Sequence, residues 1–123
     1  AMDKEAIFAK VKQLVEKYSK DMDVRSDSPT NFSLYGKKTV EAFNKEVDGM
    51  YFASAVINKN FIGFYFFPIY THPQEFTQVP AELTKCLKGK SCFHIKVEDE
   101  LLMSQIGGIL DQGYKLYKKH EWI

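Results

Sequence analysis

The chain has 123 residues, a length that fits one domain, and a chain of this size buries roughly two thirds of its unfolded surface without disulfides or metal. Apolar residues make up 45% and charged residues 27%, with a net charge of +1, which argues against disorder and against general nucleic-acid binding. Ten Phe and seven Tyr are more rings than a small core needs, so the composition favours an aromatic cavity or interface. We expect one domain over residues 2–123.

The sequence has no apolar run near the roughly 20 residues that span a bilayer and no amino-terminal secretory signal. These features predict a cytoplasmic protein with neither a membrane nor a nucleic acid as partner. Two cysteines, Cys86 and Cys92, are too few for a disulfide framework, and we expect both to be free thiols. No cofactor is predicted.

The first predicted element is a helix over residues 3–19, because Ile7, Val11 and Val15 recur at helical spacing. Asp3 is its expected N-cap. Residues 20–31 have no hydrophobic period and many turn formers, so they are predicted to be a loop. Two short strands are expected at residues 32–35 and 39–43, and residues 44–49 are expected to connect them to the centre of the chain.

The centre of the chain, residues 50–68, predicts a β-hairpin. Two β-branched and aromatic runs flank the polar turn residues Asn58, Lys59 and Asn60. In the second run, Ile62, Phe64 and Phe66 share one face, while Phe61, Gly63, Tyr65 and Phe67 share the other. Both faces are apolar. We therefore expect the second face either to be covered or to hold a ligand or partner.

The remaining chain predicts a loop after Pro68, a short helix at 80–87, a fifth strand at 91–96 and a long helix from about Glu98. Gly107, Gly108 and Gly113 weaken this last helix, so we expect them to allow close approach to the sheet. The predicted fold is α+β: a helix, five antiparallel strands with a short helix inserted before the last strand, and a closing helix.

Several strings resemble the YdhG-like family of small bacterial domains of unknown function. They are Asp48–Ala53, Phe61–Tyr70, Leu87–Ile95 and Gly113–Tyr117, together with Trp122. The resemblance implies a helix, five-stranded antiparallel sheet, helix fold of the secretion-chaperone-like type. Some relatives carry the label of frataxin-like iron chaperone, and the family implies no catalytic residues.

Iron binding of that kind would require oxygen ligands gathered on one surface. The first predicted helix instead carries more lysines than carboxylates, and the cluster Glu98, Asp99 and Glu100 stands where a helix amino end favours acidic residues. No metal site is predicted from these residues, and an iron chaperone is kept as an alternative function.

Cys92 and His94 are two residues apart on a predicted strand, so their side chains share one face. This pair is a candidate for an activated thiolate or a soft-metal site, with Cys86 and His72 as further ligands. The nearby lysines would lower the pKa of an accessible Cys92. Buried cysteine also serves as a small hydrophobe, so a packing role for Cys92 stays open.

We expect a non-catalytic binding module whose aromatic sheet face holds a small ligand or a partner, with a homodimer as one form of that partner. The alternatives are metal handling and a thiol-dependent enzyme that uses Cys92. The predicted ligand-binding residues are Tyr65, Phe67, Tyr70, His72, Lys88, Lys90, Ser91, Cys92 and His94.

Overall fold

The computed structural model describes residues 2–123 as an α+β fold with an antiparallel main sheet. Asp3 caps the first helix as predicted, its carboxylate accepting a hydrogen bond of 3.1 Å from the Ala6 N–H. The elements are α1 (Lys4–Glu16), the 3₁₀ helix η1 (Ser19–Asp21), β1 (Asp23–Ser28), β2 (Asn31–Tyr35), β3 (Thr39–Ala42), β4 (Lys45–Asp48), β5 (Tyr51–Ile57), β6 (Ile62–Phe66), α2 (Pro68–Thr71), the 3₁₀ helix η2 (Pro73–Phe76), α3 (Ala81–Thr84), β7 (Leu87–Lys88), β8 (Cys92–Ile95) and α4 (Glu100–Lys119).

The main sheet has six strands in the order β1-β2-β5-β6-β8-β7, so the prediction of five strands was wrong. The predicted loop over residues 20–31 contains the edge strand β1. Most of its side chains are exposed, which is why it lacks the apolar alternation of a half-buried strand. The strand predicted at 39–43 lies outside the main sheet, because β3 pairs with β4 in a separate two-stranded ribbon.

The segment after the central hairpin is also more ordered than predicted. Residues 68–76, expected to be a loop, form α2 and η2, and the short helix expected at 80–87 ends earlier, as α3. The residues that follow α3 form β7, which pairs with β8. The central hairpin itself is confirmed, with β5 and β6 antiparallel and adjacent.

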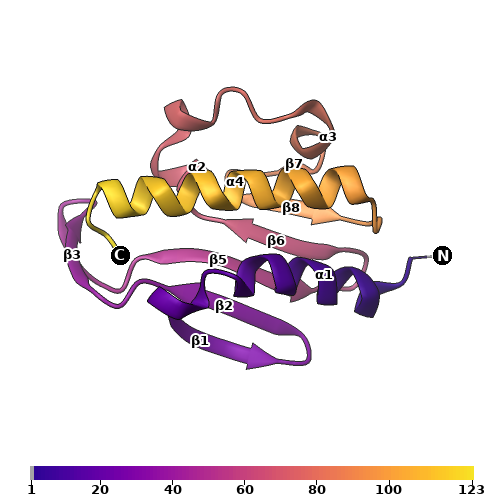
Figure 1. The fold of residues 1–123 in the computed structure, drawn as a ribbon, viewed down its shortest axis with the longest axis horizontal. Helices are drawn as coiled ribbons and strands as arrows, with labels where there is room; N and C mark the ends of the chain where they lie inside the picture. Colours follow the sequence, from indigo (N-terminus) through magenta and orange to yellow (C-terminus); the bar gives the residue numbers. More distant parts are fainter. Residues whose placement is uncertain (1) are drawn as a thin grey trace.

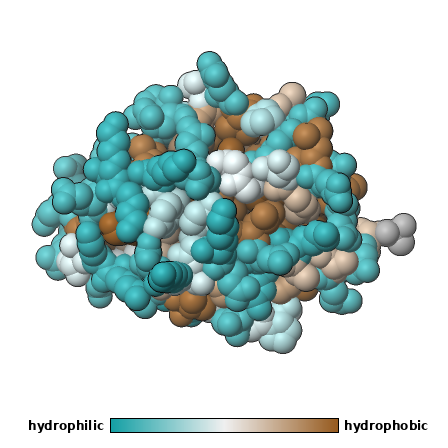
Figure 2. Space-filling model, viewed as in Figure 1, coloured by the Kyte–Doolittle hydropathy of each residue, from teal (hydrophilic) through white to brown (hydrophobic). Residues whose placement is uncertain are grey.

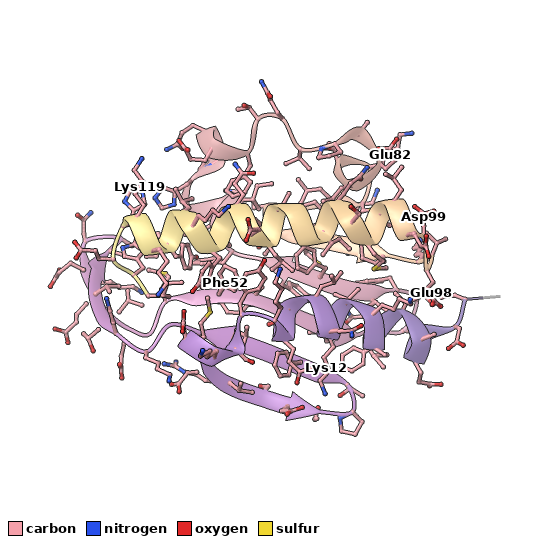
Figure 3. The ribbon with its side chains drawn as sticks, viewed as in Figure 1. Lys12, Phe52, Glu82, Glu98, Asp99 and Lys119 are labelled. Carbon is pink, nitrogen blue, oxygen red and sulfur yellow. The ribbon has the colours of Figure 1, made fainter. Side chains whose placement is uncertain are left out.

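The two long helices lie on the same side of the sheet, with α2 to α3 beside α4 (Figure 1). The core fills the space between the helices and the sheet. Phe52 is buried there, with its ring centroid 5.9 Å from Tyr18, 6.2 Å from Phe66 and 5.5 Å from Tyr117. Figure 3 places Phe52 near the middle of the molecule, and Asp99 and Lys119 at opposite ends of α4. Figure 2 shows that mainly hydrophilic side chains cover the solvent side of these helices.

The helices cover only one face of the central pair. Ile62, Phe64 and Phe66 are fully buried on the helix side, while Tyr65 and Phe67, on the opposite face, are partly exposed. We call this opposite side the outer face. Neither long helix packs on this face, so its side chains pack on one another and on the short helix α2, or meet a partner.

One of the three α4 glycines meets the expectation of close helix approach. A Cβ atom at Gly113 would lie 2.6 Å from Cζ of Phe66 and 2.9 Å from Cγ of Pro68. At Gly107 the nearest neighbour, Leu14, is at an ordinary contact distance, and at Gly108 the space is open. Gly113 therefore sets how close α4 lies to β6.

Replacing Gly113 by Ala is expected to destabilise the protein by about 1–3 kcal/mol, because the added methyl group overpacks the contact with Phe66. Gly108→Ala in the same helix is the matched control, and it should stabilise the protein by up to about 1 kcal/mol through helix propensity. Urea unfolding of both variants measures the difference. Equal stability of the two variants would contradict the close packing at Gly113.

Candidate functional site

A run of stacked rings crosses the outer face, and we call it the aromatic strip: Tyr35, Tyr51, Phe67, Tyr70 and Phe43. Tyr35 and Tyr51 have centroids 4.9 Å apart, and Tyr51 and Phe67 are 5.5 Å apart. Phe67 stacks on Tyr70 at 5.2 Å and meets the edge of Phe43 at 6.3 Å. The rings come from β2 (Tyr35), β5 (Tyr51) and α2 (Tyr70), and from the residues directly after β6 (Phe67) and β3 (Phe43). Parts of the chain distant in sequence therefore meet in one aromatic surface.

A register shift between β2 and β5 sets up the first pair of rings. Leu34 pairs with Ala53 but Tyr35 pairs with Tyr51, so β5 has one extra residue, Phe52, at this point. Phe52 points into the core, while Tyr51 stays on the outer face beside Tyr35. This bulge allows one short segment to supply rings to both faces of the sheet.

Each end of the strip carries a cation. The guanidinium carbon of Arg25 lies 4.4 Å from the centroid of Tyr35, and Nζ of Lys90 lies 5.8 Å from the centroid of Tyr70. Both distances fall in the range of cation–π attraction. The strip therefore has a cation at each end, Arg25, which is also 3.6 Å (Nε to Oδ2) from Asp23, and Lys90.

Phe43 has an unusual backbone for an aromatic residue. Its φ is 55° and that of Asn44 is 59°, so both lie in the left-handed region in the turn between β3 and β4. A bulky residue in this region costs of order 1 kcal/mol. Its side chain is 51% exposed although the ring touches Phe67. The ribbon thus holds an exposed ring at the edge of the strip at an energetic cost.

A chain of hydroxyl groups lies beneath the rings. Ser33 and Ser54 are buried, with their hydroxyl oxygens 2.6 Å apart, and Ser33 also donates to Oδ1 of Asn31 at 2.7 Å. The Tyr51 hydroxyl hydrogen-bonds Ser54. Burial raises the pKa of Tyr51 well above its ordinary value, so this hydroxyl stays protonated. The network fixes the Tyr51 ring in position.

The other part of the outer face joins Tyr65, Cys92 and His94. Tyr65 pairs with Cys92 and Gly63 pairs with His94 across the β6–β8 ladder. The His94 ring stacks on Phe61 at 3.6 Å, nearly parallel. The Tyr65 ring lies so close to Gly63 that a Cβ there would be 2.7 Å from Cε1 of Tyr65. The predicted sharing of one face by these side chains is therefore present.

Three further predicted site residues, Lys88, Lys90 and Ser91, lie on β7 or in the turn between β7 and β8. Lys88 pairs with Cys92 across β7 and β8, and Lys90 contacts Tyr70 at the end of the strip. Ser91 is half-buried, and its carbonyl accepts a hydrogen bond of 2.8 Å from Phe66 N–H. Gly89 has a φ of 80° in the turn between β7 and β8.

His72 lies apart from the rest of the predicted site. Its ring stacks on His120 at 4.6 Å and lies 5.2 Å from Trp122, and its Nδ1 hydrogen-bonds the Thr71 hydroxyl at 2.7 Å. Trp122 in turn packs on the core residue Tyr117 at 5.0 Å. His72 therefore helps to hold the residues that follow α4, and it is not brought to Cys92 or His94.

The thiol and metal alternatives gain little from this geometry. Burial raises the pKa of Cys92, and a hydrogen bond from the Tyr65 hydroxyl opposes this with a smaller effect. The sequence had suggested the opposite direction, a pKa lowered by nearby lysines. Cys86 and Cys92 are both free thiols. Among residues 2–123, no group of three or more His, Cys, Asp or Glu side chains is placed to hold a metal ion.

Sequence reasoning did not select two rings of the strip, Tyr35 and Phe43, or the Arg25 side chain at its end. Arg25 lay in the predicted loop, and Phe43 at the end of a strand that was expected to join the main sheet. The alternation of Ser33 and Tyr35 around the buried Leu34 is the signal that marks their shared face.

Comparison of the chain with protein-family models, with curated proteins and with solved structures finds no match. No helix within residues 2–123 is long and apolar enough to cross a membrane.

The Cys92 thiol is expected to ionise above the usual pKa of about 8.5, because burial disfavours the thiolate. The pH dependence of iodoacetamide alkylation in the Cys86→Ser variant measures this pKa. Adding Tyr65→Phe should raise it further, since the Tyr65 hydroxyl favours the thiolate. A pKa below that of free cysteine would restore the nucleophile hypothesis.

The protein is expected to lose stability as the pH falls from 7.5 to 5.5. Burial and the neighbouring His120 lower the pKa of His72, against an opposing effect of Glu75, and burial with two lysines lowers that of His94. As the pH falls through about 6.5, the usual histidine pKa in an unfolded chain, these histidines bind protons more readily in the unfolded chain than in the folded protein. Protonation therefore favours unfolding. Urea midpoints at both pH values test this effect, and His72→Gln should show a smaller loss than the wild type. A wild-type midpoint that does not fall would contradict it.

Proposed function

We propose that the protein is a non-catalytic binding module whose outer sheet face holds a small ligand or a partner, which includes a second copy of the chain. The observation that carries the proposal is the aromatic strip on a sheet face that neither long helix covers. Rings give a large contact area at a low cost in conformational entropy, and for this reason they are common in binding surfaces.

The exposure of the strip supports binding over simple packing. Phe43 is 51% and Tyr70 45% exposed, and these two rings flank Phe67. An apolar cluster of this kind at the surface is typical of interaction sites. The two-residue turn between Ala42 and Lys45 requires the left-handed backbone at Phe43, but a bulky ring in such a turn costs stability, which supports a role for the ring besides folding.

The finer assignments belong to the same proposal. Membership of the YdhG-like family, a secretion-chaperone-like fold and a cytoplasmic location are consistent with a helix, sheet, helix arrangement and two free thiols. The iron-chaperone alternative lacks a gathered ligand set among residues 2–123, and the enzyme alternative lacks an activated Cys92.

The test is native mass spectrometry and sedimentation velocity of gently purified protein. We expect a bound molecule or a dimer in the wild type, and loss of either in the double variant Phe43→Ser/Tyr70→Ser, because these two exposed rings supply the accessible apolar area of the strip. Val97→Ser/Leu101→Ser is the matched control, since both of its residues are 55% exposed and belong to no contact of the strip. It should behave like the wild type.

Two results would contradict the proposal. One is a wild-type protein that is monomeric at high concentration and carries no bound mass. The other is a bound mass or dimer that survives in Phe43→Ser/Tyr70→Ser but is lost in Val97→Ser/Leu101→Ser.

A further inference from the structure

A groove of about 480 Å³ opens beside the strip, between the segment that follows β6 and the edge of the sheet. Ile69, Tyr70, Pro73 and Phe76 line one side of it, and Leu87 and Lys90 line the other. Tyr70 belongs to both features, because its ring stacks on Phe67 of the strip. Leu87 pairs with the buried Phe93 and Phe76 packs on the buried Phe66, so the groove opens at the β7 edge toward the helix side of the sheet and meets the strip at Tyr70.

The lining has one sign of charge and little other polarity. Five of the six side chains named above are apolar or aromatic, Lys90 is the single ionised group, and the lining contains no carboxylate. Ligand sites are typically clefts of about 300–1,000 Å³ that combine an apolar lining with a few polar groups to fix orientation. The volume and the lining of this groove fit that description.

Lys90 stands where it can meet a ligand's head group. It is exposed in the turn between β7 and β8, and its ammonium lies at the Tyr70 ring without a salt bridge in the described chain. At the neighbouring Gly89, an added Cβ would have no atom within 4 Å, so this side of the groove is open. A bound anion at this turn would gain the attraction of Lys90 without displacing an existing carboxylate.

We propose that this groove binds a small amphipathic anion, an aromatic or aliphatic body with one carboxylate, sulfonate or phosphate head group. The apolar body lies along Ile69, Phe76 and Leu87, and the head group faces Lys90. This inference rests on the proposed binding function and adds to it a specific cavity and a ligand class.

The test uses two fluorescent probes that share an anilinonaphthalene-type body. One is 8-anilinonaphthalene-1-sulfonate, and the other is the uncharged N-phenyl-1-naphthylamine. We expect the sulfonate probe to bind the folded protein at one site. Lys90→Gln should weaken its binding about fivefold and leave the neutral probe unchanged, because the variant removes only the charge. Lys59→Gln, the same change in the turn at the other end of β6, should alter neither probe.

The comparison with Phe43→Ser separates this inference from the proposed function, since Phe43 belongs to the strip but does not line the groove. Sulfonate binding that is weakened in Lys90→Gln but not in Phe43→Ser supports the groove. Loss in Phe43→Ser alone would overturn the groove and keep binding by the outer face. Probe binding that no variant changes, or an equal effect of Lys90→Gln and Lys59→Gln, would overturn the anion site.

Displacement of the bound probe gives a second readout of the ligand class. Octanoate should displace the sulfonate probe at lower concentration than octanol, because only the carboxylate can pair with Lys90. This difference should shrink in Lys90→Gln. Equal displacement by the two compounds from the wild-type protein would contradict the head-group assignment.

Discussion

The fold depends on the packing of Phe52 between the sheet and both long helices. Its ring contacts Tyr18 just after α1, Phe66 on β6 and Tyr117 on α4. One buried side chain therefore connects the sheet to both long helices. Gly113 allows α4 to come down onto Phe66 beside it. Because both long helices pack on this face, neither is available to cover the other, and the outer face is built from side chains that pack on one another, with Tyr70 of the short helix α2 among them.

The outer face meets this requirement with rings over hydroxyl groups. Ser33 and Ser54 fill the space beneath Tyr51 and satisfy each other's hydrogen bonds, which matters because an unpaired buried hydroxyl is costly. The β5 bulge lets Phe52 serve the core while Tyr51 serves the outer face. The cations Arg25 and Lys90 lie against the rings at the two ends of the aromatic strip, Tyr35 and Tyr70. The result is a surface that is ordered without being covered.

Much of this arrangement follows from local patterns. The helix period around Val11, the Asp3 cap and the alternation around Phe64 predict α1 and the central hairpin, and they place Tyr65 and Phe67 on a separate face. The edge strand β1 could not be recognised, because its exposed charged residues have no apolar period. The contacts of Arg25 and Phe43 depend on tertiary placement, namely the pairing of β1 with β2 and the separation of the β3–β4 ribbon, and no local signal contains it. His72 was expected near Cys92 and His94, but its ring stacks on His120. Local patterns could not indicate this contact, because His120 comes from the far end of the chain.

The two lateral edges of the sheet have a bearing on how any partner can attach. At one border, β1 carries Asp23, Arg25 and Asp27, and at the other, β7 is two residues long and runs directly into a turn. Charged or very short border strands discourage another chain from extending the hydrogen-bonded ladder. A partner of the proposed outer face would then be selected by the shape of the rings and the positions of the charges on that face. Main-chain pairing, which does not depend on side chains, would contribute little.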